Sequence, residues 1–309
     1  YLQKQSYHVS SLANKRFPVP SRKFSLLRSI HFITIGAVLA VIGVLFYLGN
    51  TKPPKPKENK MPTLEEAAAM QKTHVATPAS FDSILLAAKT ELPEHAKNEV
   101  SGIEAAISSK TDSSAMSAEF EALAKVWQEH KHFPIAAYYY LQAGKLVNSE
   151  KKLTFAAHLF LDLARKSNSE AMQVWEGQMA IDGYKRVLAI NPDNDTASVS
   201  LAECYIGTGE TMQGVLLLRE LTTKKPDNIP ANLILGQQGL VSGQFDKALL
   251  RFKNVLDQEP GNLEAMLGMA EAYKNKGDKN KAIEVLERAK KTMNNPDFTK
   301  DIDNYIKTF

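Results

Sequence analysis

The chain has 309 residues, of which 44% are hydrophobic and 23% are charged, and it contains one cysteine. A single cysteine excludes an intramolecular disulfide and a thiolate metal cluster. The formal net charge of +4 conceals a division, because residues 1–60 hold ten basic residues and one acid while the remainder holds 28 basic and 33 acidic residues. The charge is therefore +9 in the first part and −5 in the second. Since the basic excess is confined to one end, we expect no nucleic-acid-binding domain.

Residues 1–29 are basic, contain several serines and lack acidic residues, and Pro18 and Pro20 would break a long helix. This composition predicts a solvated N-terminal tail. A mitochondrial presequence has the same composition, so that alternative stays open.

Residues 30–48 form an apolar segment without Asp, Glu, Lys or Arg. At 1.5 Å per residue such a helix reaches close to ~30 Å, the thickness of the hydrocarbon core of a bilayer. We therefore expect a single transmembrane helix. The basic residues are slightly more numerous ahead of it than behind it, which favours a cytoplasmic N-terminus. In a bacterium this orientation would anchor the chain in the inner membrane and place the rest in the periplasm.

Residues 49–80 are predicted to be a Pro- and Lys-rich linker, extended and semi-rigid over its first part. Within it, residues 64–71 are expected to form a short helix, with Thr63 and Glu66 spaced as in a capping box. The following residues, 81–116, have the pattern of a divergent helical hairpin.

Three Pro-x-Asn tripeptides then recur 34 residues apart, at Pro192–Asn194, Pro226–Asn228 and Pro260–Asn262. Counted from the residue after each tripeptide, small residues recur at positions eight and twenty, and glycine recurs at position fifteen. These residues are Ala202, Gly236 and Ala270; Gly214, Ala248 and Ala282; and Gly209, Gly243 and Gly277. Small residues allow two helices to cross closely, and glycine permits the tight turn between them.

This pattern resembles the tetratricopeptide repeat, a helix pair of 34 residues. The resemblance implies an all-α protein, a tetratricopeptide-repeat right-handed α-solenoid preceded by the transmembrane helix. The expected units are 117–150, 151–194, 195–228, 229–262 and 263–296, followed by a capping helix at 297–309. Four further segments are similar to membrane-anchored periplasmic repeat proteins of the Bacteroidota: Thr211–Gly214, Leu217–Glu220, Ser242–Ala248 and Asp301–Ile306.

The unit 151–194 exceeds the period by about eight residues. We expect the excess, residues 166–175, to be an insertion between its two helices, which in helical solenoids often lies on a binding face. Trp175 in this insertion is either a core residue or part of such a face.

No catalytic motif is present: the sequence lacks a Gly-rich phosphate loop, Gly-x-Ser-x-Gly, His-Glu-x-x-His and Cys-x-x-Cys. His130 and His132 form a His-x-His in an expected turn, but they have no third ligand in sequence reach. Cys204 lies among small and apolar residues and is expected to be a packing residue. We therefore expect no enzyme, no cofactor and no metal site.

In tetratricopeptide repeats the concave groove is lined mainly by positions two, five, nine, twelve and thirteen of the first helix of each unit. Carried over to this sequence, the resemblance implies a partner-binding groove made of Val199, Glu203, Ile206, Leu233, Gln237, Leu240, Val241, Leu267, Glu271 and Lys274. Its apolar middle and charged edge suit a helix or an extended peptide. Alternatively, the C-terminal part of the chain or the superhelix itself covers these side chains.

Together these features predict a non-enzymatic, membrane-anchored scaffold that is an accessory subunit of an inner-membrane protein complex, of the translocon or envelope-assembly type. Its partner would be a protein, neither a nucleic acid nor a small-molecule substrate. Two alternatives remain open, a periplasmic folding chaperone for exported proteins and a mitochondrial membrane assembly or import factor.

Overall fold

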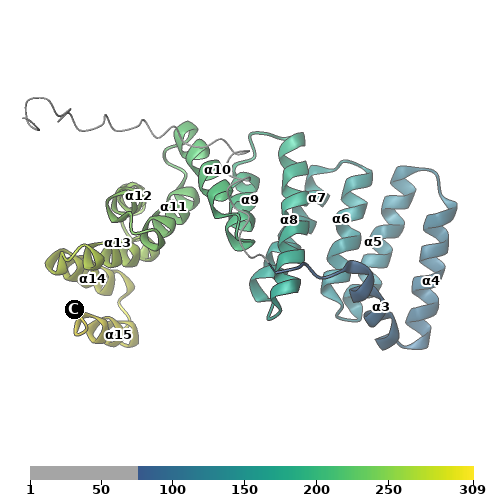
Figure 1. The fold of residues 1–309 in the computed structure, drawn as a ribbon, viewed down its shortest axis with the longest axis horizontal. Coiled ribbons are helices and arrows are strands. Elements are labelled where there is room, and N and C mark those ends of the chain that lie inside the picture. The colour runs from purple at the N-terminus through teal and green to yellow at the C-terminus, as the bar shows by residue number, and fades with distance from the viewer. Residues whose placement is uncertain (1–75) are drawn as a thin grey trace, which may run out of the picture. The chain divides into compact units, whose positions relative to one another are not determined.

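The computed structural model describes residues 76–309, and every regular element in this part is an α-helix (Figure 1). The expected tail (1–29), transmembrane helix (30–48) and short linker helix (64–71) lie outside the described residues. Among the helices of residues 76–309, none combines the length and the hydropathy that crossing a bilayer requires.

The described part contains thirteen helices. Their bounds are α3 (Phe81–Glu91), α4 (Glu94–Ser109), α5 (Ser113–Glu129), α6 (Phe133–Leu146), α7 (Glu150–Lys166), α8 (Glu170–Ile190), α9 (Asp195–Gly207), α10 (Thr211–Lys224), α11 (Ile229–Val241), α12 (Phe245–Gln258), α13 (Leu263–Asn275), α14 (Lys279–Met293) and α15 (Pro296–Ile306).

From α5 onward the helices form consecutive pairs, α5 with α6 through α13 with α14, and each pair packs on the next in chain order (Figure 1). Helix α15 packs on α14 at the end of the series. The expectation of an all-α helical solenoid is thus confirmed for the described residues.

The Pro-x-Asn tripeptides mark the start of α9, α11 and α13. In each, the asparagine is the N-cap, and its side-chain oxygen accepts a hydrogen bond of 2.9 Å from the backbone N–H three residues later. This bond satisfies one of the N–H groups that a helix start leaves without an intrahelical partner. The three glycines of the helix-to-helix turns, Gly209, Gly243 and Gly277, have φ of 86°, 69° and 84°. Such values are costly for residues that carry a Cβ, so the repeated glycines follow from the turn geometry.

The small residues of the repeat allow large side chains to be buried between helices. Phe252 on α12 is 1% exposed, and its ring lies against both Gly236 on α11 and Gly268 on α13. A Cβ added to Gly236 or Gly268 would lie 2.6 or 2.4 Å from ring atoms of Phe252. These contacts are closer than van der Waals packing permits, so the ring needs glycine on both sides.

The excess residues of the second unit are mostly helical rather than an inserted turn. Helix α7 has 17 residues and α8 has 21, whereas the next pair has 13 and 14. Only residues 167–169 separate the two helices, and Ser169 caps α8 by accepting a hydrogen bond from the Met172 N–H. The expectation of an inserted turn at 166–175 is therefore corrected: the added residues bury Val174 and Trp175, which stabilises extra helical turns instead of a loop.

The residues around the start of α3 also contact the extra turns of α8. The Ala79 N–H donates a 2.9 Å hydrogen bond to the Ala171 carbonyl oxygen at the start of α8. The Phe81 ring stacks on Tyr138 of α6 at 3.7 Å between centroids and lies 6.1 Å from Trp175 of α8. Trp175 is only 5% exposed, so it is a core residue here and not part of a binding face.

Glu176, the next residue on α8, is a buried carboxylate with 3% exposure. Its Oε2 atom has no hydrogen-bond partner within the described residues. Burial raises the pKa of Glu176 from 4.5 to about 7, because an apolar environment disfavours the charged form, and a hydrogen bond from Ser167 opposes part of this rise.

We expect Gly268→Ala to lower the free energy of unfolding by about 1–3 kcal/mol, because the new methyl group overlaps the buried Phe252 ring. The matched control is Gly102→Ala on α4, where an added Cβ meets nothing within 4 Å. This control should raise stability by about 0.5–1 kcal/mol through helix propensity alone. Urea unfolding of both variants checks the pair, and a Gly268→Ala protein as stable as the wild type would contradict the packing described.

The raised pKa of Glu176 also predicts that the stability of the fold depends on pH. Between pH 4.5 and about 7 the folded chain holds a proton on Glu176 that the unfolded chain has lost, so stability falls as the pH rises through this window and levels off above it. The total loss is on the order of 3 kcal/mol. Glu176→Gln keeps a neutral side chain at every pH, so it should match the wild type near pH 4.5 and exceed it at pH 8. Equal stability of the two proteins at both pH values, measured by urea unfolding, would show that the carboxyl group is not held neutral.

Candidate functional site

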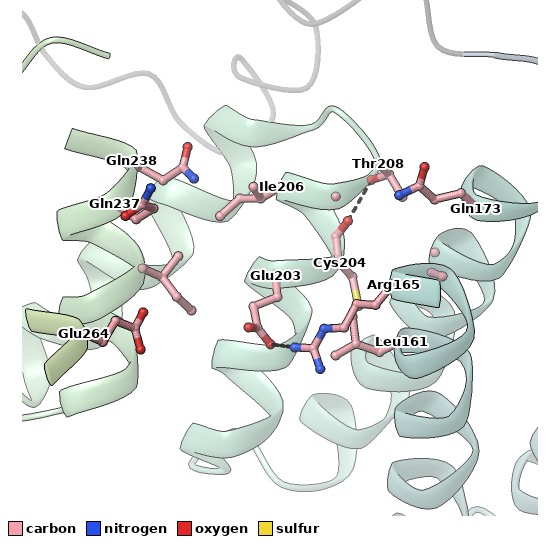
Figure 2. A pocket seen from close by; sticks show the side chains of 14 residues that line it. Leu161, Arg165, Gln173, Glu203, Cys204, Ile206, Thr208, Gln237, Gln238 and Glu264 are labelled. Atoms are coloured by element: carbon pink, nitrogen blue, oxygen red, sulfur yellow. Dashed lines mark hydrogen bonds and ion pairs between the residues drawn. The ribbon is translucent and has the colours of Figure 1, made fainter. Parts of the chain in front are cut away.

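A cavity of about 310 Å³ opens between helices of successive repeats (Figure 2). Its walls come from α7, α8, α9, α11 and the first turn of α13, together with Thr208, which follows α9. The lining residues are Leu161, Ala164, Arg165, Gln173, Gly177, Glu203, Cys204, Ile206, Gly207, Thr208, Ile234, Gln237, Gln238 and Glu264. The cavity therefore depends on the stacking of one complete helix pair, α7 with α8, against the first helices of the next three pairs.

The lining has an apolar part and a polar part. Leu161, Ala164, Ile206 and Ile234 contribute aliphatic surface. The polar part includes three amide side chains, which can both donate and accept hydrogen bonds; these are Gln173, Gln237 and Gln238. This combination of apolar surface and a few polar groups is typical of ligand and peptide sites.

The charged groups of the lining are Arg165, Glu203 and Glu264. The Arg165 Nη2 atom lies 2.9 Å from Oε2 of Glu203, joining α7 to α9, as Figure 2 shows. Its Nη1 atom lies 3.4 Å from Oδ1 of Asp162 on the same helix. The Arg165 side chain is half exposed, so solvent screening leaves each pair a weak contribution to stability. The pairs do fix the direction in which the guanidinium points.

The lengthened second unit builds one wall of this cavity. Arg165 lies in the last turn of α7, beyond the length of the regular first helices, and Gln173 lies in the added turns of α8. Gly177 completes this wall, because a Cβ there would lie 2.4 Å from the methyl group of Thr208. The Thr208 hydroxyl donates to the carbonyl oxygens of Cys204 and Tyr205, at 3.0 and 3.2 Å, which holds that methyl group against α8.

Cys204 faces the cavity but is 2% exposed. Burial raises the pKa of its thiol to about 12, with a smaller contribution in the same direction from the nearby Glu203 carboxylate. The thiol therefore stays protonated at neutral pH and is a poor nucleophile and a poor metal ligand.

The two histidines of the His-x-His pattern lie elsewhere, at the turn between α5 and α6. The His132 Nε2 atom is 4.0 Å from Oε2 of Glu91, and the ring of His130 lies 5.8 Å from that of His95. Within residues 76–309 no group of three or more His, Cys, Asp or Glu side chains has the geometry of a metal site.

The ten residues predicted for the groove fall into different environments. Glu203, Ile206 and Gln237 line the cavity together. Val241, Leu267 and Glu271 are exposed on α11 and α13, outside the cavity lining, and Leu233 is half-buried on α11.

Two predicted groove residues are corrected to core residues. Val199 is 8% exposed and packs with Leu218 and Leu221, and Leu240 is 7% exposed and packs with Phe252. Both side chains are apolar and point between helices, where burial is more favourable than exposure. Neither offers surface to a partner in this arrangement.

The Lys274 side chain contacts the C-terminal end of the chain. Its Nζ atom lies 4.2 Å from the ring centroid of Tyr305, 4.6 Å from that of Phe309 and 3.1 Å from the Thr308 hydroxyl oxygen. For this one residue, the C-terminal part of the chain covers the predicted groove.

Several lining residues were not predicted, among them Arg165, Gln173, Gln238 and Glu264. Glu264 occupies position two of its unit, one of the groove positions of the repeat, so the sequence contained a signal for it. Arg165 and Gln173 had no such signal, because the added turns of α7 and α8 fall outside the 34-residue register.

Comparison with known proteins identifies the repeat. Residues 240–299 match the family model described as tetratricopeptide repeat. No curated protein sequence matches the chain.

Solved structures with a similar fold include a tetratricopeptide repeat protein from Parabacteroides merdae, 17% identical, with a TM-score of 0.47 over 71% of this chain and 86% of that one. The type IV pilus biogenesis factor PilW is 17% identical, with a TM-score of 0.46 over 72% of this chain and 99% of that one. MamA is 17% identical, with a TM-score of 0.46 over 57% of this chain and 91% of that one. At these identities and scores the likeness concerns the fold only. The family match, the capping asparagines and the turn glycines together show that the chain contains a tetratricopeptide repeat domain.

Proposed function

We propose that the chain is a non-enzymatic scaffold whose repeats hold a protein partner at the cavity between α7, α8, α9, α11 and α13. One observation carries the proposal: a cavity of about 310 Å³ is built jointly by successive repeats and combines aliphatic surface with polar side chains. Its size lies at the lower end of the range of ligand pockets. It therefore suits one or a few side chains of a larger partner.

The amide side chains at the cavity support a peptide-like partner. Gln173 lies in the first turns of α8, Gln237 and Gln238 lie on α11, and all three line the cavity from its two sides (Figure 2). Backbone N–H and C=O groups of a bound segment need partners of both kinds, which carboxamides provide. The aliphatic surface would take the apolar side chains of the same segment.

We further propose that residues 30–48 anchor the scaffold in a bacterial inner membrane, with the repeats in the periplasm. The support is the apolar sequence of this segment and the distribution of basic residues around it. A tethered scaffold of this kind suits an accessory subunit of an integral membrane complex, for example a translocon or an envelope-assembly machine.

We expect Gly207→Leu to block the partner. Gly207 lines the cavity at the end of α9, and an added Cβ there meets nothing within 4 Å, so we expect a leucine side chain at this position to occupy part of the cavity. A photoreactive residue at Gln237 in full-length protein in native membranes should crosslink the partner, and Gly207→Leu should abolish this product.

Gly102→Leu is the matched control, because Gly102 is equally open but lies on α4, away from the cavity. The control should leave the crosslink intact. A crosslinked product that survives Gly207→Leu would contradict docking at the cavity, whatever the partner is.

The membrane proposal has its own test. In intact spheroplasts of a bacterial host, added protease should degrade the repeats while a tag at the N-terminus stays protected. Release of the full-length chain from the membrane by carbonate at high pH would overturn the proposed anchor. Protection of the repeats from protease would overturn the proposed orientation.

A further inference from the structure

We infer that the segment held at the cavity is cationic and aliphatic: an aliphatic side chain enters the cavity, and a neighbouring lysine or arginine lies against Glu264. This inference rests on the proposed function and specifies the chemistry of its partner. It is carried by the balance of charges at the cavity and by the adjoining face of α13.

Negative charge exceeds positive charge at the cavity. Among the described residues that line it, the cation is Arg165, which is shared between Glu203 and Asp162. Glu264 lines the opposite side, and within the described residues it makes no ion pair and no side-chain hydrogen bond. Its place in the first turn of α13 favours a negative charge through the helix dipole, but leaves the exposed carboxylate free to meet a cation.

The acidic surface continues along α13. Glu264, Leu267 and Glu271 are spaced by three and four residues, so they lie on one face of the helix, with the two carboxylates about 10 Å apart along its axis. Leu267 is 37% exposed between them. The face therefore alternates negative charge with aliphatic surface, which complements a segment that alternates positive charge with aliphatic side chains.

The nearest lysine on α13 does not neutralise this face. Lys274 follows Glu271 by three residues, yet its Nζ atom lies over the rings of Tyr305 and Phe309 and near the Thr308 hydroxyl. The C-terminal helix thus holds the ammonium group away from Glu271. An acidic segment would meet carboxylates without a compensating cation, so its binding is disfavoured.

The shape of the cavity fixes where the aliphatic group goes. Leu161, Ile206 and Ile234 contribute side chains from α7, α9 and α11. A leucine, isoleucine or methionine of the partner would remove this surface from water. Since Glu264 lines the same cavity, the cation must lie within a residue or two of that side chain.

The inference can be tested with a display library of random 12-residue peptides selected on the full-length chain in detergent. The same selection is run on Gly207→Leu and on Gly102→Leu. Peptides bound by the wild type and by Gly102→Leu but not by Gly207→Leu define binders of the cavity. We expect this set to be enriched in Lys and Arg next to Leu, Ile or Met, and depleted in Asp and Glu.

Variants at single carboxylates then test the role of Glu264. For an enriched cationic peptide, Glu264→Gln should weaken binding about two- to fivefold, the range expected for a partly exposed ion pair. Glu99→Gln, which removes an exposed carboxylate on α4, should leave the affinity unchanged. Fluorescence anisotropy with the labelled peptide in 150 mM salt measures both.

The possible failures are distinct. Binders that are sensitive to Gly207→Leu but acidic or without charge preference, or an affinity unaffected by Glu264→Gln, would overturn the cationic inference and leave the cavity as a docking site. A selection without any binder sensitive to Gly207→Leu would overturn the docking site itself and the inference with it.

Discussion

The packing of one large side chain against small residues of the helices beside it is the constraint on which the other features depend. Phe252 fills the space between α11, α12 and α13, and that space exists because Gly236 and Gly268 lack side chains. A single helix pair cannot enclose such a ring, since one of its two glycine partners belongs to the next pair. Each repeat therefore completes the core of its neighbour, and stability is built up along the chain.

The cavity, like the core, lies between successive repeats. Where the 34-residue period is regular, the side chains of neighbouring helices pack closely. The second unit is longer than this period. Its longer helices carry Arg165 and Gln173 past the ends of the regular helices, where they stand beside α9 and form a wall. The irregular unit thus supplies one wall of the cavity.

The repeat period made the local features of the fold predictable. Asn194, Asn228 and Asn262 cap helices and Gly209, Gly243 and Gly277 turn the chain because these roles depend on nearby backbone, which sequence spacing specifies. Features that depend on contacts outside the period were not predictable. Val199 and Leu240 occupy groove positions by count, yet neighbouring repeats bury them. Lys274 contacts Tyr305 of α15, which is not part of the repeat. Residues 166–175 are mostly helical because Val174 and Trp175 are buried in the core.

The contacts of Phe81 also determine how the molecule would bear a load. The described chain begins by joining α8, through the hydrogen bond from Ala79 to Ala171, and then inserts Phe81 between Tyr138 and Trp175. A pull on the chain from its N-terminal side would therefore act on α6 and α8 together, because Phe81 contacts one ring of each and Ala79 is bonded to the start of α8.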